Sequence, residues 1–327
     1  MSTLITGVAG FIGYHVAQRL LNDGEDVIGV DNLNNYYDVG LKSARLSQLT
    51  TQKRFRFFHC DVSDFAALSP LTAANPDIDN IIHLAAQAGV RHSLIDPFAY
   101  ITANVMGHLT VLEAARRLSR LRHIVYASSS SVYGGNTKLP FSESDRVDTP
   151  LSVYAATKRA DELLSHAYGH LHGLPQTGLR FFTVYGPWGR PDMAYFSFAR
   201  AIVAGTPITL YGRGELRRDF TYIDDIVDGV LRSATTPPTG STPLRILNIG
   251  NNNSERVIDL VEFLEKHLNR KAVIIYAECP PTEVPETFAD IDAIKTLAGF
   301  APTTPLSQGI PRFVEWFRSY YAWPNNQ

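Results

Sequence analysis

The sequence contains only two cysteines among its 327 residues, Cys60 and Cys279. So few cysteines exclude a disulfide-stapled fold and a cysteine-rich metal cluster, and they predict a reducing compartment. The sequence also lacks an excess of either charge, because 30 Lys and Arg residues nearly balance 32 Asp and Glu residues and leave a net charge of −2. Without a basic excess, we expect neither nucleic acid nor a membrane surface as a partner. No apolar run approaches the ~20 residues of a membrane-spanning helix and no signal-type segment is visible, so we expect a cytoplasmic protein.

What the sequence does contain is an alternation of apolar runs and helical patterns. The apolar runs predict strands, and the spacing between them predicts helices. We expect strands at 4–6, 27–30, 55–59, 80–84, 123–127, 176–182 and 244–249. We expect helices at 11–22, 40–50, 63–73, 97–119, 152–172 and 223–234. This order predicts the α/β class, with a doubly wound parallel Rossmann-type sheet.

The pattern changes after Phe182. Residues 185–222 are rich in glycine, proline and arginine, and the last helical stretch is aromatic at 313–317. We therefore expect a smaller C-terminal lobe that binds substrate beside the Rossmann domain. The predicted division assigns 1–183 and about 223–250 to the Rossmann domain, and about 184–222 and 251–327 to the lobe.

A glycine turn followed by an acid suggests a dinucleotide site. Gly7, Gly10 and Gly13 follow the first expected strand and open the first expected helix. Without Cβ atoms the chain can turn tightly and approach a pyrophosphate, to which the helix N-terminus offers free N–H groups. Asp31 ends the second expected strand eighteen residues after Gly13, where its carboxylate can accept both ribose hydroxyls. Asn32 follows it instead of an arginine, which favours NAD over NADP; a tight turn with a capping acid is the alternative interpretation.

A tyrosine, a lysine and a serine suggest hydride chemistry on an alcohol. Tyr154 and Lys158 are four residues apart on an expected helix, so they share one face. Oxidising a secondary alcohol needs a base for the hydroxyl proton while hydride leaves carbon, and a neighbouring ammonium favours the phenolate form of a tyrosine. Ser129 follows the fifth expected strand, where its hydroxyl can hold the substrate oxygen. A solvated Tyr–Lys pair is the alternative interpretation.

Together these features resemble the extended branch of the short-chain dehydrogenase/reductase superfamily over essentially the whole chain. Segments 81–86 and 104–107 are also similar to that branch. The resemblance implies that NAD is bound, with Asp61 near the adenine edge. The implied cofactor-binding residues are Gly7, Gly10, Phe11, Ile12, Gly13, Asp31, Asn32, Asp61, Val62, Leu84, Ala85, Ala86, Asn104, Ser128, Tyr154 and Lys158.

Within that branch the sequence looks closely like the UDP-glucuronate 4-epimerases, on segments 32–38, 87–91 and 180–194. The resemblance implies conversion of UDP-glucuronate to UDP-galacturonate, by oxidation at C4 and return of hydride to the opposite face. It implies catalytic roles for Tyr154, Lys158, Ser129 and Ser130. The implied substrate-binding residues are Gln87, Ser129, Ser130, Thr183, Arg190, Tyr211, Arg218 and Glu283.

The resemblance also assigns roles within the substrate site. Arg190 would lie near the uronate carboxylate, which suits a guanidinium fork, although a surface ion pair is the alternative interpretation. Arg218 would clamp the diphosphate, and Tyr211 would lie along the uridine. Thr282 and Glu283 stand where the family usually has Gly-Asp.

Other activities stay open at this point. Sugar-nucleotide 4,6-dehydratases and UDP-glucuronate decarboxylases carry carboxylates where this chain has Ser130 and Ser131, and serine supplies no such acid or base. A UDP-glucose/UDP-galactose 4-epimerase is the nearest alternative, against which Arg190 discriminates. A non-catalytic NAD-binding protein is disfavoured, because such relatives commonly lose the Tyr or the Lys.

The resemblance further implies a homodimer in which the helices expected at 97–119 and 152–172 pack as a four-helix bundle. We expect no metal ion. His166, His170 and His172 have helical spacing, but no carboxylate or cysteine cluster accompanies them.

Overall fold

The structure is a computed structural model and describes residues 1–280 and 284–323. Its largest layer is a seven-stranded sheet with the strand order β10-β6-β5-β4-β1-β2-β3, in which neighbouring strands are parallel. The strands are β1 (Ser2–Thr6), β2 (Asp26–Asp31), β3 (Phe55–His59), β4 (Asn80–His83), β5 (His123–Ser129), β6 (Gln176–Phe181) and β10 (Leu244–Ile249). The order reverses between β1 and β4, so the sheet is doubly wound, which confirms the predicted Rossmann-type α/β class.

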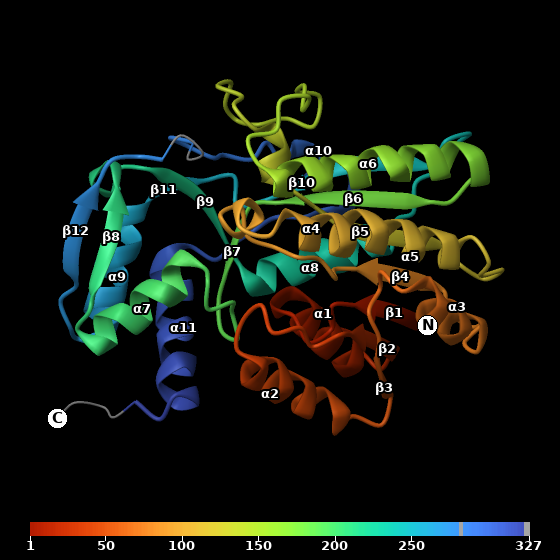
Figure 1. Cartoon of the computed structure of the whole chain (residues 1–327), viewed down its shortest axis with the longest axis horizontal. Coiled ribbons are helices and arrows are strands. Elements are labelled where there is room, and N and C mark those ends of the chain that lie inside the picture. Colours follow the sequence, from red (N-terminus) through yellow and green to blue (C-terminus); the bar gives the residue numbers. More distant parts are fainter. Residues whose placement is uncertain (281–283, 324–327) are drawn as a thin grey trace.

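Helices cover both faces of this sheet (Figure 1). Side chains of α1, α2 and α8 belong to the apolar cluster on one face, and those of α3, α5 and α6 pack in the cluster on the other. Their bounds are α1 (Phe11–Asn22), α2 (Val39–Thr50), α3 (Phe65–Ala73), α5 (Gly107–Ala115), α6 (Val153–His172) and α8 (Ile223–Ala234). Ile81 and Ile82 are adjacent on β4, yet they belong to opposite clusters and each is 1% exposed. This two-sided burial is the reason that the strands are continuous apolar runs in the sequence.

The helix expected at 97–119 is interrupted. It consists of α4 (Pro97–Tyr100), a π-helical turn (Ile101–Met106) and α5, which ends at Ala115. π-helical turns are rare in proteins, and those that do occur are frequently found at functional sites. Here the turn buries the side chain of Asn104 between the β4–α4 connection and α6. The short helical turns elsewhere are η1 (His92–Leu94), η3 (Ser130–Tyr133) and η4 (Gly212–Gly214).

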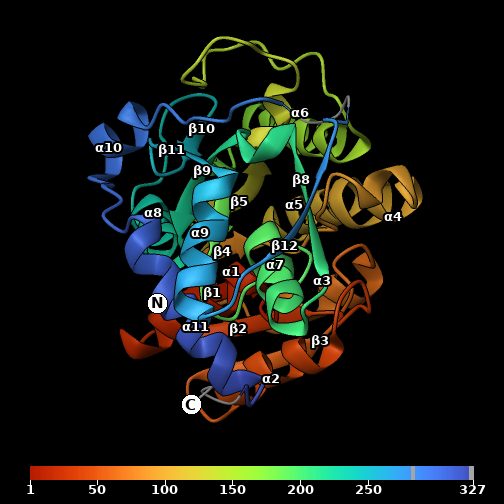
Figure 2. The same cartoon turned by 90° about the vertical axis from the view of Figure 1, so that its left-hand side faces the viewer.

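A second group of small elements, called the lobe below, stands beyond the carboxyl ends of the sheet strands. It lies at the left of Figure 1 and faces the viewer in Figure 2. Its strands are β7 (Thr183–Tyr185), β8 (Pro207–Tyr211), β9 (Arg217–Tyr222), β11 (Ser254–Arg256) and β12 (Val273–Ala277). Its helices are α7 (Ala194–Ala204), α9 (Val257–Leu268) and α11 (Leu306–Tyr320). The strands form a β11-β9-β7 sheet and a β12-β8 sheet. Sequence patterns did not predict these strands, because they are short and most of them include charged or exposed positions instead of a continuous buried run.

One further helix bears on the predicted division into domains. Helix α10 (Asp292–Ala298) packs against α8 and β10 of the large sheet, although the prediction assigned 251–327 to the lobe. Strand β10 joins the large sheet, as a segment of the Rossmann domain should. The division itself stays a prediction. Within residues 1–280 and 284–323, no helix combines the length and the apolar character that crossing a membrane requires.

Candidate active site

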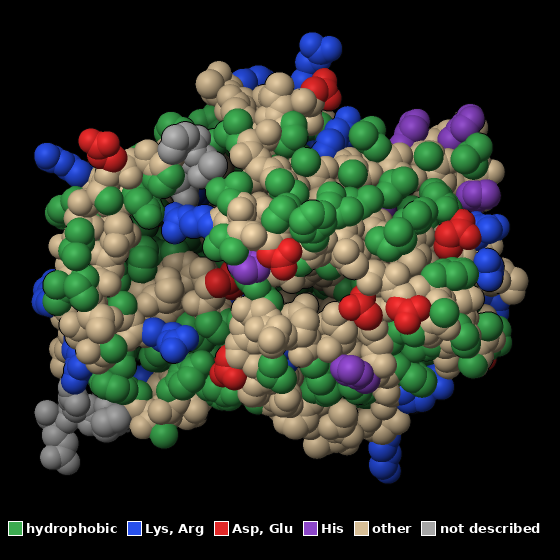
Figure 3. All heavy atoms as spheres, in the orientation of Figure 1, with side chains coloured by type: hydrophobic (Ala, Val, Ile, Leu, Met, Phe, Trp, Pro, Cys, Tyr) green, Lys and Arg blue, Asp and Glu red, His purple; other side chains and the backbone are tan. Residues whose placement is uncertain are grey.

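A cavity of about 840 Å³ lies between the carboxyl ends of the sheet strands and the lobe. The space-filling view shows the molecule hollowed at this place, between the lobe on the left and the sheet with its helices (Figure 3). Residues that follow β1, β4, β5 and β6 line one side of it, and residues of α7, β8 and β9 line the other. In open parallel sheets, ligands bind at this end of the strands, on either side of the point where the strand order reverses.

The glycine turn borders the cavity at the N-terminus of α1. Gly7 has a φ of +71°, which side chains rarely adopt, and a Cβ on it would lie 2.7 Å from the backbone nitrogen of Ala85. A Cβ on Gly10, the N-cap of α1, would lie 2.9 Å from the carbonyl oxygen of Gly7. The turn therefore needs its glycines, and it leaves the N-terminus of α1 open toward the cavity. This arrangement fits a dinucleotide pyrophosphate.

The two acids of the expected cofactor site also lie at the cavity. Asp31 accepts hydrogen bonds from the backbone N–H of Ala9 at 3.0 Å and of Leu33 at 2.8 Å. Asp31 therefore pins the glycine turn but does not cap α1 as the alternative interpretation would require, and each carboxylate oxygen can accept a further hydrogen bond from a ribose. Burial works against the charge of Asp61, but hydrogen bonds from Ser63 and Asn32 hold the pKa of its carboxyl below the usual value.

The Tyr–Lys pair lies on the first turns of α6. Ser152 caps this helix, because its Oγ accepts the N–H of Ala155 at 3.1 Å. Tyr154 and Lys158 both line the cavity, and the Tyr154 ring packs edge-to-face on Tyr100 with centroids 6.0 Å apart. Lys158 is only 2% exposed. Its Nζ donates to Oδ2 of Asp161 at 2.7 Å, a partner that sequence reasoning missed.

The serines expected beside this pair line the cavity at the end of β5. Ser129 Oγ accepts the N–H of Ser131 at 3.1 Å and so starts the η3 turn. Ser128 Oγ donates to Oε1 of Glu162 at 2.6 Å. Ser128 therefore connects the strand end to α6, whereas Ser130 adds a further hydroxyl to the cavity wall.

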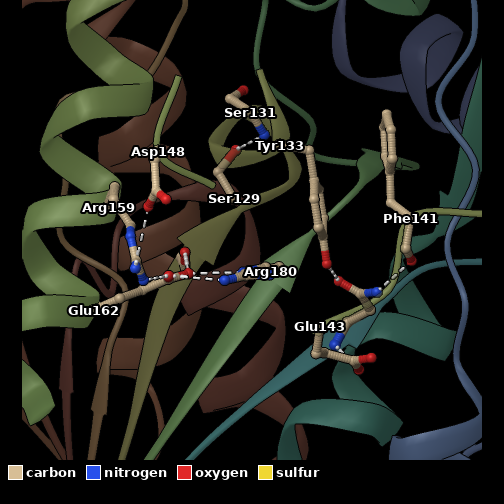
Figure 4. A network of polar contacts seen from close by, with 11 residues as sticks. Ser129, Ser131, Tyr133, Phe141, Glu143, Asp148, Arg159, Glu162 and Arg180 are labelled. Atoms are coloured by element: carbon tan, nitrogen blue, oxygen red, sulfur yellow. Dashed lines mark hydrogen bonds and ion pairs between the residues drawn. The ribbon is translucent and has the colours of Figure 1, made fainter. Parts of the chain in front are cut away.

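A buried ion-pair network supports this strand end from behind (Figure 4). Glu162 on α6 accepts two parallel hydrogen bonds from Arg180 on β6, at 2.8 and 2.9 Å, and a third from Arg159 at 3.0 Å. Burial opposes the charge of Glu162, but these guanidinium groups hold its pKa below the usual value. Close by, the hydroxyl of Tyr133 donates to Asn248 at 2.6 Å, which ties η3 to β10.

Arg190 lines the cavity but already has a carboxylate partner. Its Nε and Nη2 donate to the two oxygens of Asp192 at 3.0 and 2.5 Å, and Tyr36 donates its hydroxyl to the same carboxylate at 3.2 Å. Burial opposes the charge of Asp192, but Arg190 holds its pKa below the usual value. The structure thus shows the ion pair that was the alternative interpretation of Arg190. Asp192 lies only two residues after Arg190, a spacing that could have indicated it.

Most other residues of the expected site also line this one cavity. They include Phe11, Ile12, Gly13, Asn32, Val62, Leu84, Ala85, Ala86, Gln87, Thr183, Tyr211 and Arg218. Asn104 is not among the lining residues, because its side chain bonds the backbone N–H and carbonyl of Gln87 and the hydroxyl of Thr157. Glu283 lies outside the described residues. Tyr37, Lys42 and Arg91 line the cavity without having been predicted, and Arg91 stacks over the ring of Tyr211 at 5.1 Å.

Comparison with known proteins shows a family to which the chain is similar, and relatives similar to it in sequence and fold. Residues 3–250 match the model of the NAD dependent epimerase/dehydratase family. UDP-glucuronate 4-epimerase 1 of Arabidopsis thaliana is 48% identical, over 99% of this chain and 78% of that protein. The crystal structure of UDP-glucuronic acid 4-epimerase from Bacillus cereus, in complex with UDP-glucuronic acid and NAD, is 35% identical with a TM-score of 0.90, over 98% and 100% of the two chains. The UDP-glucose 4-epimerase of Thermotoga maritima is 28% identical with a TM-score of 0.87, over 98% and 100%.

Proposed function

The chain belongs to the NAD-dependent epimerase/dehydratase family, and from this premise we propose that it is a nucleotide-sugar 4-epimerase that converts UDP-glucuronate to UDP-galacturonate. One observation carries the proposal: Tyr154, Lys158 and Ser129 line the same cavity as the glycine turn. A base for a sugar hydroxyl and a site for a dinucleotide therefore lie within one half-enclosed cavity.

NAD is the cofactor of this family, and it fits the residues that line the cavity. Gly7, Gly10 and Gly13 would hold the pyrophosphate, Asp31 the adenosine ribose and Asp61 the adenine edge. When bound, the cofactor would supply a hydride acceptor for C4 of the sugar and then a hydride donor for the ketone. Because the cofactor is restored in each turnover, the net reaction needs no outside oxidant or reductant.

The residues of α6 and β5 would move the proton. Tyr154 accepts the proton of the 4-hydroxyl as the C4–H bond gives up its hydride, and it returns that proton when the ketone is reduced. The Lys158 ammonium favours the phenolate. Ser129 and Ser130 hold the 4-oxygen by hydrogen bonds. The lobe would keep the nucleotide in place, with Arg218 on the diphosphate and Tyr211 along the uridine, while the sugar turns over.

Arg190 would meet the uronate carboxylate together with Thr183. Its fork is engaged by Asp192, so a substrate carboxylate competes with that side chain for the guanidinium. The 4-keto intermediate of a uronate is a β-keto acid and can lose CO₂. Ser130 and Ser131 supply no acid or base for such a step, which supports epimerisation over decarboxylation.

The same Arg190–Asp192 pair favours the second candidate, a UDP-glucose/UDP-galactose 4-epimerase. With Arg190 neutralised by Asp192, a sugar with a neutral hydroxymethyl group can occupy the cavity without leaving a charge unpaired. The relationship to a UDP-glucose 4-epimerase of the same fold is consistent with this activity, at lower identity than the UDP-glucuronic acid enzyme.

We further propose a homodimer in which α6 and the helical segment of α4, the π-helical turn and α5 pack as a four-helix bundle. Large apolar side chains gather on this surface, which Figure 3 shows at the upper right. They are Ile95, Phe98, Ile101, Met106, Leu163 and Leu171. Phe98 is 82% exposed, which is unusual for an aromatic side chain without a partner surface. A Phe98→Asp variant should elute as a monomer where the unchanged protein elutes as a dimer.

A cytoplasmic location and the predicted two-domain division complete the proposal. Cys60 and Cys279 form no disulfide within residues 1–280 and 284–323, which suits a reducing compartment. The lobe would bind the nucleotide sugar, because β8 and β9 present Tyr211 and Arg218 to the cavity.

Proton NMR of the purified protein with UDP-glucuronate tests the proposed function. Signals of UDP-galacturonate, with the carboxylate retained, are the expected result. A pentose product would show decarboxylation instead. Interconversion of UDP-glucose and UDP-galactose without any turnover of the uronate would favour the second candidate.

A further inference from the structure

Asp161 lies one helical turn after Lys158 on α6, and both side chains are buried. The two side chains are 1% and 3% exposed, and Lys158 Nζ donates to Asp161 Oδ2 at 2.7 Å. The other oxygen, Oδ1, is buried and has no hydrogen-bond partner among the described residues. A buried carboxylate is unfavourable unless it is paired. The Lys158 ammonium is the partner that keeps Asp161 in place.

The groups packed against this pair from β4, α5 and β5 are uncharged at neutral pH. They are His83, His108 and Tyr126. Burial lowers the pKa of His83 to about 3 and that of His108 well below its usual value, so both imidazole rings are neutral at pH 7. Burial also raises the pKa of Tyr126, so its phenol stays protonated.

Among the remaining neighbours of the Lys158–Asp161 pair, the charges of Glu162 and Arg180 cancel each other, and Tyr100 is neutral. Glu162 on α6 is paired with Arg180 of β6 in the buried network. Tyr100 of α4 packs on Tyr154, and burial raises the pKa of its phenol well above the usual value. Burial raises the pKa of Asp161 to about 6, against the effect of Lys158, so Asp161 is a charged neighbour of Lys158 above that pH.

We propose that Asp161 is a positioning residue: it holds the Lys158 ammonium, partly cancels its charge, and so sets the pH above which Tyr154 can accept the substrate's proton. The proposal rests on the proposed role of Tyr154 as the base. Tyr154 and Asp161 are two helical turns apart, roughly 10 Å along the axis. At such a distance in a protein, one unit charge shifts a proton equilibrium by about half to one pH unit.

The sign of the effect follows from charge alone. Removing a carboxylate makes the cluster of Tyr154 and Lys158 more positive, so the first proton leaves it at lower pH. If that proton comes from Tyr154, the active phenolate forms earlier. If it comes from Lys158 instead, the acid limb of the pH–rate profile still moves to lower pH. The rate at the plateau of that profile then falls, because the phenolate has lost its ammonium.

The first test is the pH profile of kcat/KM for UDP-glucuronate in the Asp161→Asn variant, from about pH 5 to about pH 9. We expect the acid limb to move down by about half to one pH unit, with Asp161→Glu restoring the original limb. Asp148→Asn is the matched control, because it removes the same charge from a side chain that is 63% exposed and should leave the limb unchanged. An unmoved limb in Asp161→Asn, or one moved to higher pH, overturns the proposal.

The second test does not depend on turnover. Ultraviolet absorbance titrations of the NAD-loaded protein and of its Tyr154→Phe variant isolate the Tyr154 phenolate by difference. The same pair of titrations in the Asp161→Asn background should show the phenolate at lower pH, or show its signal reduced if Lys158 loses the proton. An identical difference titration in both backgrounds overturns the proposal.

These tests separate the proposal from the proposed function. If UDP-glucuronate is not epimerised but the phenolate titration moves, the function is wrong and the role of Asp161 stands. If epimerisation occurs and neither the limb nor the titration moves, the role of Asp161 is wrong. Should Asp161→Asn fail to fold, Asp161→Ala removes the same charge without a new amide and is titrated in its place.

Discussion

At the scale of single residues, each cationic side chain expected to act on the sugar has an acid of its own beside it. Lys158 is bound by Asp161, and Arg190 by Asp192. A bare ammonium or guanidinium in a half-enclosed cavity would be unfavourable. The acids remove that penalty, but they also weaken the charge that the substrate meets. Substitution of these two acids should therefore change the rate and the substrate specificity, as substitution of Lys158 or Arg190 should.

The Tyr154→Phe variant should lose nearly all epimerase activity. It removes the hydroxyl that exchanges a proton with the substrate but keeps the ring that packs on Tyr100. We expect kcat to fall by roughly 10²–10⁴-fold, the usual contribution of a general base. The rate of UDP-galacturonate formation measures it, and bound NAD per chain should stay the same. Undiminished turnover would show that another group is the base.

The Asp192→Asn variant should favour the uronate. It leaves an amide that can still accept from Arg190 but removes the competing charge. KM for UDP-glucuronate should fall roughly threefold to tenfold, which corresponds to the net contribution of about one ordinary hydrogen bond, while KM for UDP-glucose stays unchanged. Steady-state kinetics on both substrates, with Arg190→Ala as the opposite control, measures this. Equal changes for the two substrates would argue against a contact between Arg190 and the carboxylate.

At the scale of elements, helix α6 carries the reaction because it is fixed at both its start and its middle. Ser152 caps the first turn, and Glu162 joins the middle to β5 and β6 through Ser128 and Arg180. The π-helical turn before α5 adds a third fixation, since its Asn104 donates to Thr157 on the same helix at 2.9 Å. Tyr154 and Lys158 are thereby held against the strand end that supplies Ser129.

The Glu162→Gln variant should therefore be much less stable than the unchanged protein. The change leaves Arg180 buried without its counter-charge, which typically reduces the free energy of unfolding by about 3–5 kcal/mol. Asp77→Asn is the matched control, because Asp77 is 76% exposed and its ion pair with Arg120 should contribute less than about 1 kcal/mol. Urea unfolding curves compare the two. Similar losses in both variants would contradict the importance of the buried network.

At the scale of the whole molecule, the cavity exists because segments far apart in the chain hold the lobe against the sheet. Arg45 on α2 is fully buried and donates to the carbonyl oxygens of Ala9 in the glycine turn and of Trp188 before Arg190. His15 on α1 bonds the carbonyl oxygen of Pro187 at 3.0 Å. The expected cofactor turn and the expected sugar-binding segment are thus tied together through buried polar side chains.

Buried histidines should make the protein less stable in mild acid. Burial lowers the pKa of His15 and His123 to about 4 and that of His83 to about 3, against an unfolded value near 6.5. Because the folded values are depressed, the unfolded chain binds protons first as the pH falls. The stability is complete above about pH 6.5 and is lost toward pH 4, at up to about 1.4 kcal/mol per histidine and pH unit.

Burial raises the pKa of Asp161 and of Asp219 to about 6, and these two groups work in the opposite direction below that pH. They are outnumbered by the three histidines together with His108, whose pKa burial lowers well below its usual value. Urea unfolding at pH 7 and pH 5 checks the net result, which should be a loss of a few kcal/mol. In a His123→Gln variant, the difference in unfolding free energy between pH 7 and pH 5 should be smaller by the contribution of one histidine. Equal stability at both pH values would mean that these histidines are protonated in the folded protein.

The sequence by itself determined the large sheet and the chemistry at its edge. Strand runs such as 27–30 were recognisable because burial on both faces removes polar residues from them. The glycine turn was recognisable because its backbone and close contacts exclude a Cβ. Tyr154 and Lys158 were recognisable because residues four apart share a helix face. Each of these is a local constraint, visible within a few residues of the chain.

Only the tertiary structure decided which charges meet. Tyr36 reaches Asp192 across 156 positions of the chain, and Arg180 on β6 reaches Glu162 on α6. The π-helical turn that directs Asn104 to Gln87 instead of the cavity follows from packing against α6, and no propensity indicates it. The short lobe strands are likewise set by their neighbours. Pairing of charges and of short strands depends on distances between distant segments, and those distances exist only in the folded chain.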